Sequence, residues 1–124
     1  MTHTETHANH HAGGCHCGAV RFEVDLDLNA PMLECNCSIC SKTGTRLAFV
    51  GADKFKLKSG EEHLKDYLFN KKQIHHLFCT TCGIRSFARG ATPDGGQMFA
   101  VNVRCLDGVD LDAMQVKHHD GKNS

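Results

Sequence analysis

The sequence contains no tryptophan, one tyrosine and two prolines in 124 residues, and its 14 basic residues are balanced by 14 acidic ones. Zero net charge gives no overall field that would attract nucleic acid or an acidic membrane surface. No apolar run approaches the roughly 20 residues that a membrane-spanning helix requires. The first residues also lack the basic and apolar regions of a secretory signal. These absences predict a soluble protein of the cytoplasm with no nucleic-acid or membrane partner.

Cysteine, in contrast, is abundant, with eight residues in a chain long enough for one domain with a modest core. In a reducing compartment, closely spaced cysteines are typical of metal sites, whereas disulfides are typical of exported proteins. We therefore expect metal binding, and a disulfide framework is the alternative.

Short alternating segments dominate the middle of the chain. From Ala19 to Leu28, apolar residues alternate with charged ones, which is typical of a strand with one exposed face. Residues 63–69 fit either a helical turn or a strand. No segment shows a convincing helical pattern, so the predicted fold class is all-β. Further strands are expected at 32–34, 47–50, 55–58, 73–78 and 98–103, a hairpin turn at 70–72 and a loop at 89–96.

The two ends of the chain differ from the middle in composition. Residues 1–12 contain four histidines and almost nothing apolar, which predicts a disordered His-rich tail. Residues 107–124 are short and polar, and they are expected to form a weakly ordered C-terminal tail. The ordered domain is therefore expected to span residues 13–106.

Four of the cysteines form two close pairs with similar surroundings. In each pair the second cysteine is followed by glycine, and phenylalanine comes five residues after that cysteine. Glycine permits the tight turn that directs backbone N–H groups toward sulfur. The two segments therefore look like paired halves of one closed four-thiolate zinc site, which is the structural kind. The residues are Cys15, Cys17, Gly18 and Phe22, and Cys79, Cys82, Gly83 and Phe87.

Three further cysteines, Cys35, Cys37 and Cys40, lie within six residues. Cys35 and Cys37 would point to the same side of a strand, and Cys40 can return to that point if the backbone turns after Cys37. Thiolates select zinc, which prefers four ligands. Three protein ligands with one open position are the recurring arrangement of catalytic zinc, so this group is the predicted catalytic site.

The alternative is that a fourth protein ligand closes this group. Cys105 is one candidate, although a lone cysteine after a strand is more typical of a small buried core residue. His75 and His76 are the others, and because they are adjacent on a predicted strand, only one of them could face the group. A surface or packing role is favoured for each histidine.

Three segments together resemble the successive signatures of the glutathione-dependent formaldehyde-activating enzyme family, which also includes the zinc-binding domain of centromere protein V. They are residues 14–22, 35–42 and 78–83, and the resemblance covers about residues 13–106. It implies a tent-like arrangement of antiparallel sheets and a carbon–sulfur lyase that forms S-(hydroxymethyl)glutathione from glutathione and formaldehyde. It also implies a structural zinc at Cys15, Cys17, Cys79 and Cys82 and a catalytic zinc at Cys35, Cys37 and Cys40.

Two other classes of function fit the same residues. One is a zinc-stabilised binding module for a protein or chromatin partner, and the other is a zinc store or redox-responsive thiol protein. Balanced charge disfavours DNA, and the alternating Lys54, Lys56 and Lys58 are typical of a solvated strand face. Ser38, Ser41 and Lys42 flank the cysteine triple and are candidates for contact with a polar substrate.

Overall fold

The computed structural model describes residues 10–68 and 74–120. The first nine residues of the expected N-terminal tail and the expected hairpin turn at 70–72 lie outside the described residues. Strands dominate the described part, so the all-β prediction is confirmed. None of its helices has the length and apolar composition needed to span a bilayer.

A three-stranded antiparallel sheet contains β1 (His10–Gly14), β2 (Arg21–Asp25) and β5 (Phe55–Ser59), in that order. A seven-stranded sheet has the order β10-β3-β4-β9-β8-β7-β6, and only its β10–β3 pairing is parallel. Its strands are β3 (Met32–Cys35), β4 (Leu47–Gly51), β6 (Leu64–Tyr67), β7 (Ile74–Cys79), β8 (Phe87–Ala91), β9 (Gln97–Asn102) and β10 (Val116–His119).

Helical structure in the described residues is limited to single turns. The α-helix α2 (Cys40–Thr43) ends at Gly44, whose φ of 69° is left-handed. The 3-10 turns are η1 (Ala52–Lys54), η2 (Glu61–His63), η3 (Val103–Cys105) and η4 (Leu111–Ala113).

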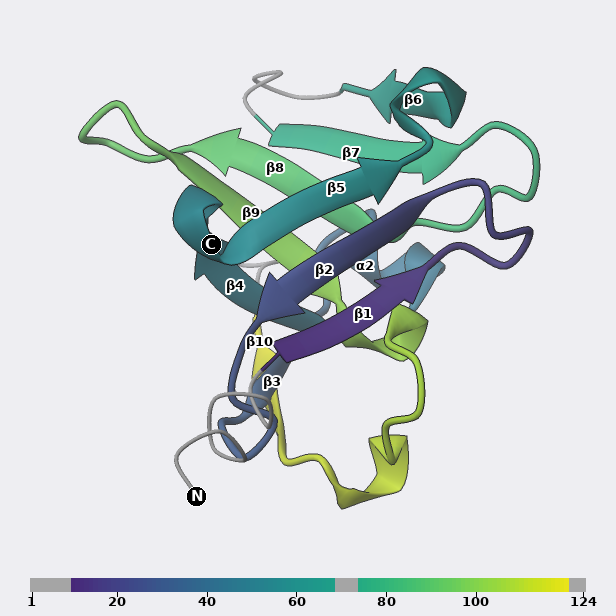
Figure 1. Cartoon of the computed structure of the whole chain (residues 1–124). Helices are drawn as coiled ribbons and strands as arrows, with labels where there is room; N and C mark the ends of the chain where they lie inside the picture. Colours follow the sequence, from purple (N-terminus) through teal and green to yellow (C-terminus); the bar gives the residue numbers. More distant parts are fainter. Residues whose placement is uncertain (1–9, 69–73, 121–124) are drawn as a thin grey trace.

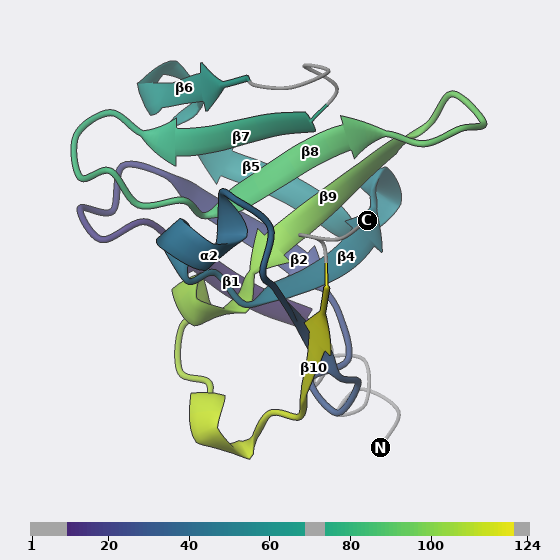
Figure 2. The same ribbon diagram turned by 180° about the vertical axis from the view of Figure 1, so that it is seen from behind.

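The three-stranded sheet covers one face of the larger sheet (Figure 1), and α2 lies on the opposite side (Figure 2). Phe55 joins the two sheets, because its ring centroid lies 5.5 Å from that of Phe22 on β2 and 4.4 Å from that of Phe99 on β9. Val101 and Val103 are completely buried beside them. The apolar core therefore fills the space between the sheets and leaves the other face of the large sheet for the site.

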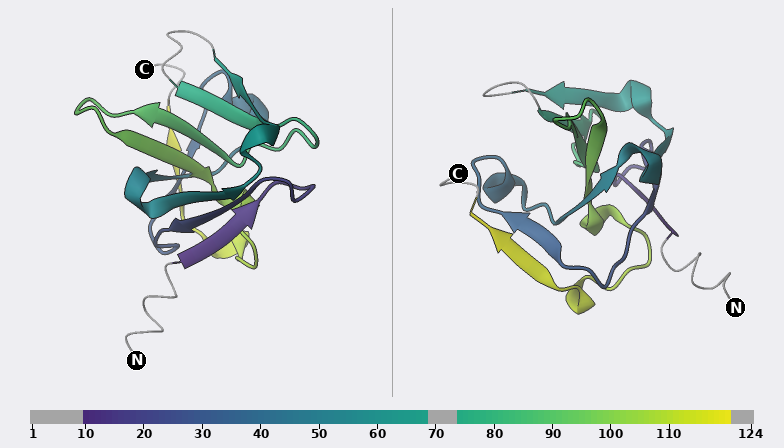
Figure 3. Two further views of the ribbon diagram at one scale, coloured as in Figure 1. Left: turned by 45° about the horizontal axis from the view of Figure 1, so that its top comes forward. Right: turned by 90° about the vertical axis from the view of Figure 1, so that its left-hand side faces the viewer.

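Both ends of the ordered region extend beyond the expected boundaries of 13 and 106. His10, His11 and Ala12 belong to β1 because they pair with Asp25, Val24 and Glu23 of β2. Residues 116–119 form β10, which pairs in parallel with all of β3 (Figure 3). Backbone pairing orders both segments although their side chains are largely polar.

Two internal segments also differ in detail from the expectations. Residues 89–91, expected in a loop, extend β8 because Arg89, Gly90 and Ala91 pair with β9. The ambiguous stretch at 63–69 begins at the end of the 3-10 turn η2 and continues as strand β6, which pairs with β7.

Candidate metal centres and the adjoining cavity

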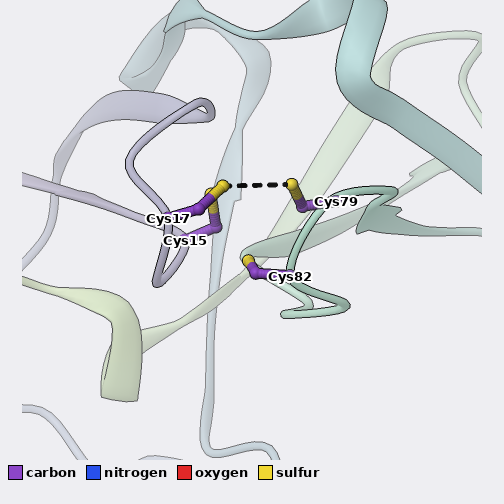
Figure 4. Close-up of side chains that lie close together, drawn as sticks. All are labelled: Cys15, Cys17, Cys79 and Cys82. Atoms are coloured by element: carbon purple, nitrogen blue, oxygen red, sulfur yellow. Dashed lines mark hydrogen bonds between the residues drawn. The ribbon is translucent and has the colours of Figure 1, made fainter.

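The two cysteine pairs lie on facing connections. Cys15 and Cys17 belong to the β1–β2 connection, whereas Cys79 ends β7 and Cys82 lies in the turn after it (Figure 4). Gly18 and Gly83 have φ values of 84° and 80°, which only glycine adopts without strain. Each turn is closed by a similar bond, since Cys15 N–H donates to Val20 O at 3.1 Å and Cys79 N–H to Ile84 O at 3.0 Å.

These four sulfurs have the spacing of a tetrahedral site. Cys15 Sγ lies 3.6 Å from Cys17 Sγ, which lies 3.7 Å from Cys79 Sγ. All four sulfurs lie within 4.8 Å of one another. A zinc ion with Zn–S bonds of about 2.3 Å would hold its sulfurs about 3.8 Å apart. The predicted group is therefore brought together, and its donor set fits zinc.

Within the four-cysteine group, the pKa values of Cys82 and Cys17 are shifted in opposite directions. Desolvation opposes ionisation of Cys82, but N–H donation from Cys17 and Ile84 outweighs it and lowers the pKa of Cys82 to about 6. The Ala19 N–H lowers the pKa of Cys17, whereas desolvation and the adjacent thiols together raise it to about 11. Full ionisation of four adjacent thiols requires a compensating cation.

The cysteine triple forms where β3 turns into α2. Cys35 ends β3, and the backbone turns so that Ser41 N–H donates to Cys37 O at 2.9 Å. The sulfurs of Cys35, Cys37 and Cys40 lie within 4.8 Å of one another. The turn expected after Cys37 is therefore present, and the three thiols suit one soft cation.

Two thiols of the triple, those of Cys37 and Cys40, have unequal acidities. Desolvation favours the neutral form of Cys37, but the Cys40 and Ile39 N–H groups and the adjacent thiols have the larger combined effect and lower its pKa. Desolvation, followed by interaction with Cys37, raises the pKa of Cys40 to about 12. Cys37 therefore ionises more readily than Cys40.

A cavity of about 440 Å³ separates the triple from the face of the large sheet that points away from the core. One row of paired residues, Phe49–Ala100–Ala88–His76, crosses β4, β9, β8 and β7 beneath it. The small side chains of the two alanines leave space in the middle of this face, and Phe49 and His76 line its sides. All three cysteines of the triple line the cavity, and none of the four paired cysteines does.

The remaining sequence candidates occupy different positions. Cys105 belongs to neither sulfur group, and its Sγ lies 3.6 Å from Asn102 Nδ2. His76 lines the cavity, whereas His75 forms an ion pair with Asp66. Ser38 lines the cavity, and Lys42 is exposed outside its lining.

Sequence patterns did not indicate two polar residues at this cavity, Arg85 and Asn102. Asn102 is buried, and its Nδ2 donates to the Arg85 carbonyl at 3.0 Å while its Oδ1 accepts from Arg104 N–H at 3.2 Å. The Arg85 guanidinium carbon lies 5.3 Å from the centroid of the Phe78 ring. Arg85 follows a cysteine turn by three positions, a spacing that belongs to no metal-site pattern. Only the tertiary structure therefore identifies it as a cavity residue.

Comparisons with known proteins identify the family of the chain. The family model for the glutathione-dependent formaldehyde-activating enzyme matches residues 10–119. A curated protein of Halomonas elongata, provisionally named as such an enzyme, is 36% identical over 80 residues, which cover 56% of this chain and 50% of that protein. The match thus spans half the length of this relative.

A crystal structure of a Rhodobacter sphaeroides protein superposes with a TM-score of 0.76 at 34% identity. The alignment covers 87% of this chain and 99% of that chain, so the two share the whole architecture. Because the family model extends from β1 to β10, the chain belongs to the glutathione-dependent formaldehyde-activating enzyme family.

Proposed function

We propose that this protein is a carbon–sulfur lyase that joins the thiol of glutathione, or a similar small thiol, to formaldehyde or another small aldehyde. Cys35, Cys37 and Cys40 would hold a zinc ion at the reaction site. The observation that carries the proposal is the position of these cysteines in the wall of the cavity of about 440 Å³. Substrate cavities commonly have volumes of about 300–1,000 Å³.

Zinc bound by three thiolates supplies one open coordination position, which can lower the pKa of a thiol or polarise an aldehyde oxygen. In the addition, a sulfur–carbon bond forms, the carbonyl π bond breaks and the thiol hydrogen ends on the oxygen. No oxidant or reductant is consumed. The product of glutathione and formaldehyde is S-(hydroxymethyl)glutathione.

Apolar side chains of the protein enclose the proposed reaction site. Leu33, Ile39, Leu47 and Phe49 supply apolar walls around the triple. Such walls exclude water from the reacting atoms and strengthen the electrostatic interactions of the thiolates. The row of alanines leaves room for the substrate against the sheet.

We assign a second zinc to Cys15, Cys17, Cys79 and Cys82, where four protein thiolates leave no position for substrate. This ion would be structural. All eight cysteines are free of disulfides, which fits the reducing cytosol as the site of the reaction.

The test combines zinc content with turnover in the Cys37→Ser variant. We expect the wild type to bind two zinc ions per chain, and the variant to bind one and to lose turnover above the uncatalysed rate. Cys105→Ser is the matched control, because Cys105 lies in neither sulfur group. It should keep both ions and the activity.

Full turnover by the Cys37→Ser variant with one zinc ion would reject the proposed reaction site. If instead the wild type shows no turnover above the uncatalysed rate, a zinc-stabilised binding module or a redox-responsive thiol protein is the better description. Uncatalysed addition of glutathione to formaldehyde must be subtracted in every measurement, because thiols add to formaldehyde without a catalyst.

A further inference from the structure

The cavity beside the triple contains one strongly basic side chain. Among the described residues that line it, Arg85 is the only lysine, arginine, aspartate or glutamate. The Nη1 atom of Arg85 is buried and has no hydrogen-bond partner within the described part of the chain. The Arg85 side chain as a whole is only partly buried. A buried N–H group without an acceptor is costly, so an anionic acceptor from outside the chain would stabilise Nη1.

The surroundings hold the guanidinium without neutralising it. Its central carbon lies 5.3 Å from the centroid of the Phe78 ring and 5.9 Å from that of Tyr67. Aromatic faces attract a cation but leave its N–H groups available for hydrogen bonds. The carboxylate of Asp66, which does not line this cavity, contacts Nδ1 of His75 through Oδ2.

His76 adds no competing positive charge. It lines the same cavity, and burial, followed by the charge of Arg85, lowers its pKa. The lowered pKa favours the neutral imidazole of His76, and Arg85 is the permanently charged cation among the described residues that line the cavity.

We propose that Arg85 binds a carboxylate of the thiol substrate and so selects anionic thiols such as glutathione over neutral thiols. This inference rests on the reaction proposed for the cysteine triple. A planar guanidinium matches a carboxylate with two parallel N–H···O bonds, which gives both affinity and orientation. Arg85 is a specificity residue, because it lines the cavity without belonging to the cysteine triple.

The test measures binding of two thiols to the zinc-loaded full chain by calorimetry. Glutathione carries two carboxylates, and its diethyl ester keeps the thiol but has none. We expect Arg85→Gln to weaken glutathione binding by about tenfold or more and to leave ester binding unchanged, since a charged hydrogen-bond pair is lost only for glutathione. Turnover should show the same change in KM for glutathione, with a smaller change in kcat.

Arg89→Gln is the matched control, because it removes the same charge from β8 outside the cavity lining. Arg85→Lys keeps the charge without the bidentate fork, and we expect it to recover part of the affinity. The Asn102 bond to residue 85 uses the backbone carbonyl, so it remains available in both Arg85 variants.

Equal loss of both ligands in Arg85→Gln would show a structural role and overturn the inference, as would unchanged binding of glutathione. Absence of measurable glutathione binding to the wild type would also overturn it. Carboxylate-dependent binding without turnover would instead reject the proposed reaction and keep the role of Arg85. Turnover without preference for glutathione over its ester would reject the role of Arg85 and keep the proposed reaction.

Discussion

Two glycines with nearly the same backbone conformation have very different surroundings. Gly60 and Gly95 have φ values of 91° and 92°. A Cβ atom on Gly60 would lie 2.3 Å from the Ala19 carbonyl oxygen, whereas nothing lies within 4 Å of one on Gly95. We expect Gly95→Ala to cost about 1–2 kcal/mol of unfolding free energy from strain alone. Gly60→Ala should cost about 1–3 kcal/mol more from the clash. Urea denaturation checks this, and equal losses would contradict it.

His10 is a residue whose charge links stability to pH. Its Nδ1 lies 2.7 Å from Asp25 Oδ1, and the hydrogen bond to this carboxylate raises the pKa of His10 above 6.5. The pair therefore stabilises the fold fully below pH 6.5, and this contribution disappears as pH rises through the folded pKa. Because both side chains are about half exposed, the effect on stability is small.

An NMR titration of the His10 ring tests this coupling. We expect a midpoint above 6.5 in the wild type and a return toward 6.5 in Asp25→Asn. Glu23→Gln should produce a smaller shift, since Glu23 Oε1 lies farther away, at 3.4 Å from Nε2. A wild-type midpoint at or below 6.5 would show that the pair does not form in solution.

Individual residues also differ in how far the sequence reveals their roles. The grouping of seven cysteines was readable because cysteines of metal sites typically occur as closely spaced pairs or triples along the chain. The cavity could not be predicted from the sequence, because its floor is a row of residues from four strands whose pairing depends on the whole fold. Arg85 and Asn102 become candidates only when these strands are assembled.

Among the elements, β2 and β5 were predictable because apolar residues alternate with polar ones, and β4 because it is a short continuous apolar run. The strand β10 was not predictable, since three of its four residues are exposed and give no alternating apolar pattern. Its order comes from backbone pairing with β3, a partner about 84 residues away in the sequence. Composition carries no information about such a distant partner.

The position of β10 leads to a prediction about the triple. Asn36, which lies between two of the triple's cysteines, donates its N–H to His119 O at 3.1 Å and its Nδ2 to Asp120 at 3.0 Å. We expect deletion of residues 116–124 to weaken zinc binding at the triple by about tenfold, while the four-cysteine group keeps its ion. Competition with a chelator measures both affinities.

Deletion of residues 121–124 alone is the control, because it leaves β10 complete. Equal zinc retention in both truncated chains would show that β3 and α2 organise the triple without β10.

In the whole molecule, the two cysteine groups constrain the chain to very different extents. Cys35, Cys37 and Cys40 lie in one segment between β3 and α2. The four-cysteine group joins a connection of the three-stranded sheet to the turn after β7 in the seven-stranded sheet, and its contact between Cys17 and Cys79 spans 62 residues. A metal ion held there would act as a cross-link between the sheets, beside the core that Phe55 completes.

This difference predicts a separation of stability from activity. We expect Cys82→Ser to lower the unfolding free energy by about 2–4 kcal/mol, the size of a long-range covalent cross-link, because metal binding there favours the folded chain. Cys37→Ser should change stability by less than about 1 kcal/mol, since it releases only a local segment. Denaturation with urea in zinc-saturated buffer, together with turnover of glutathione and formaldehyde, measures both effects. A Cys37→Ser variant that is as unstable as Cys82→Ser would place the structural metal at the triple, and the cavity beside it would then need another explanation.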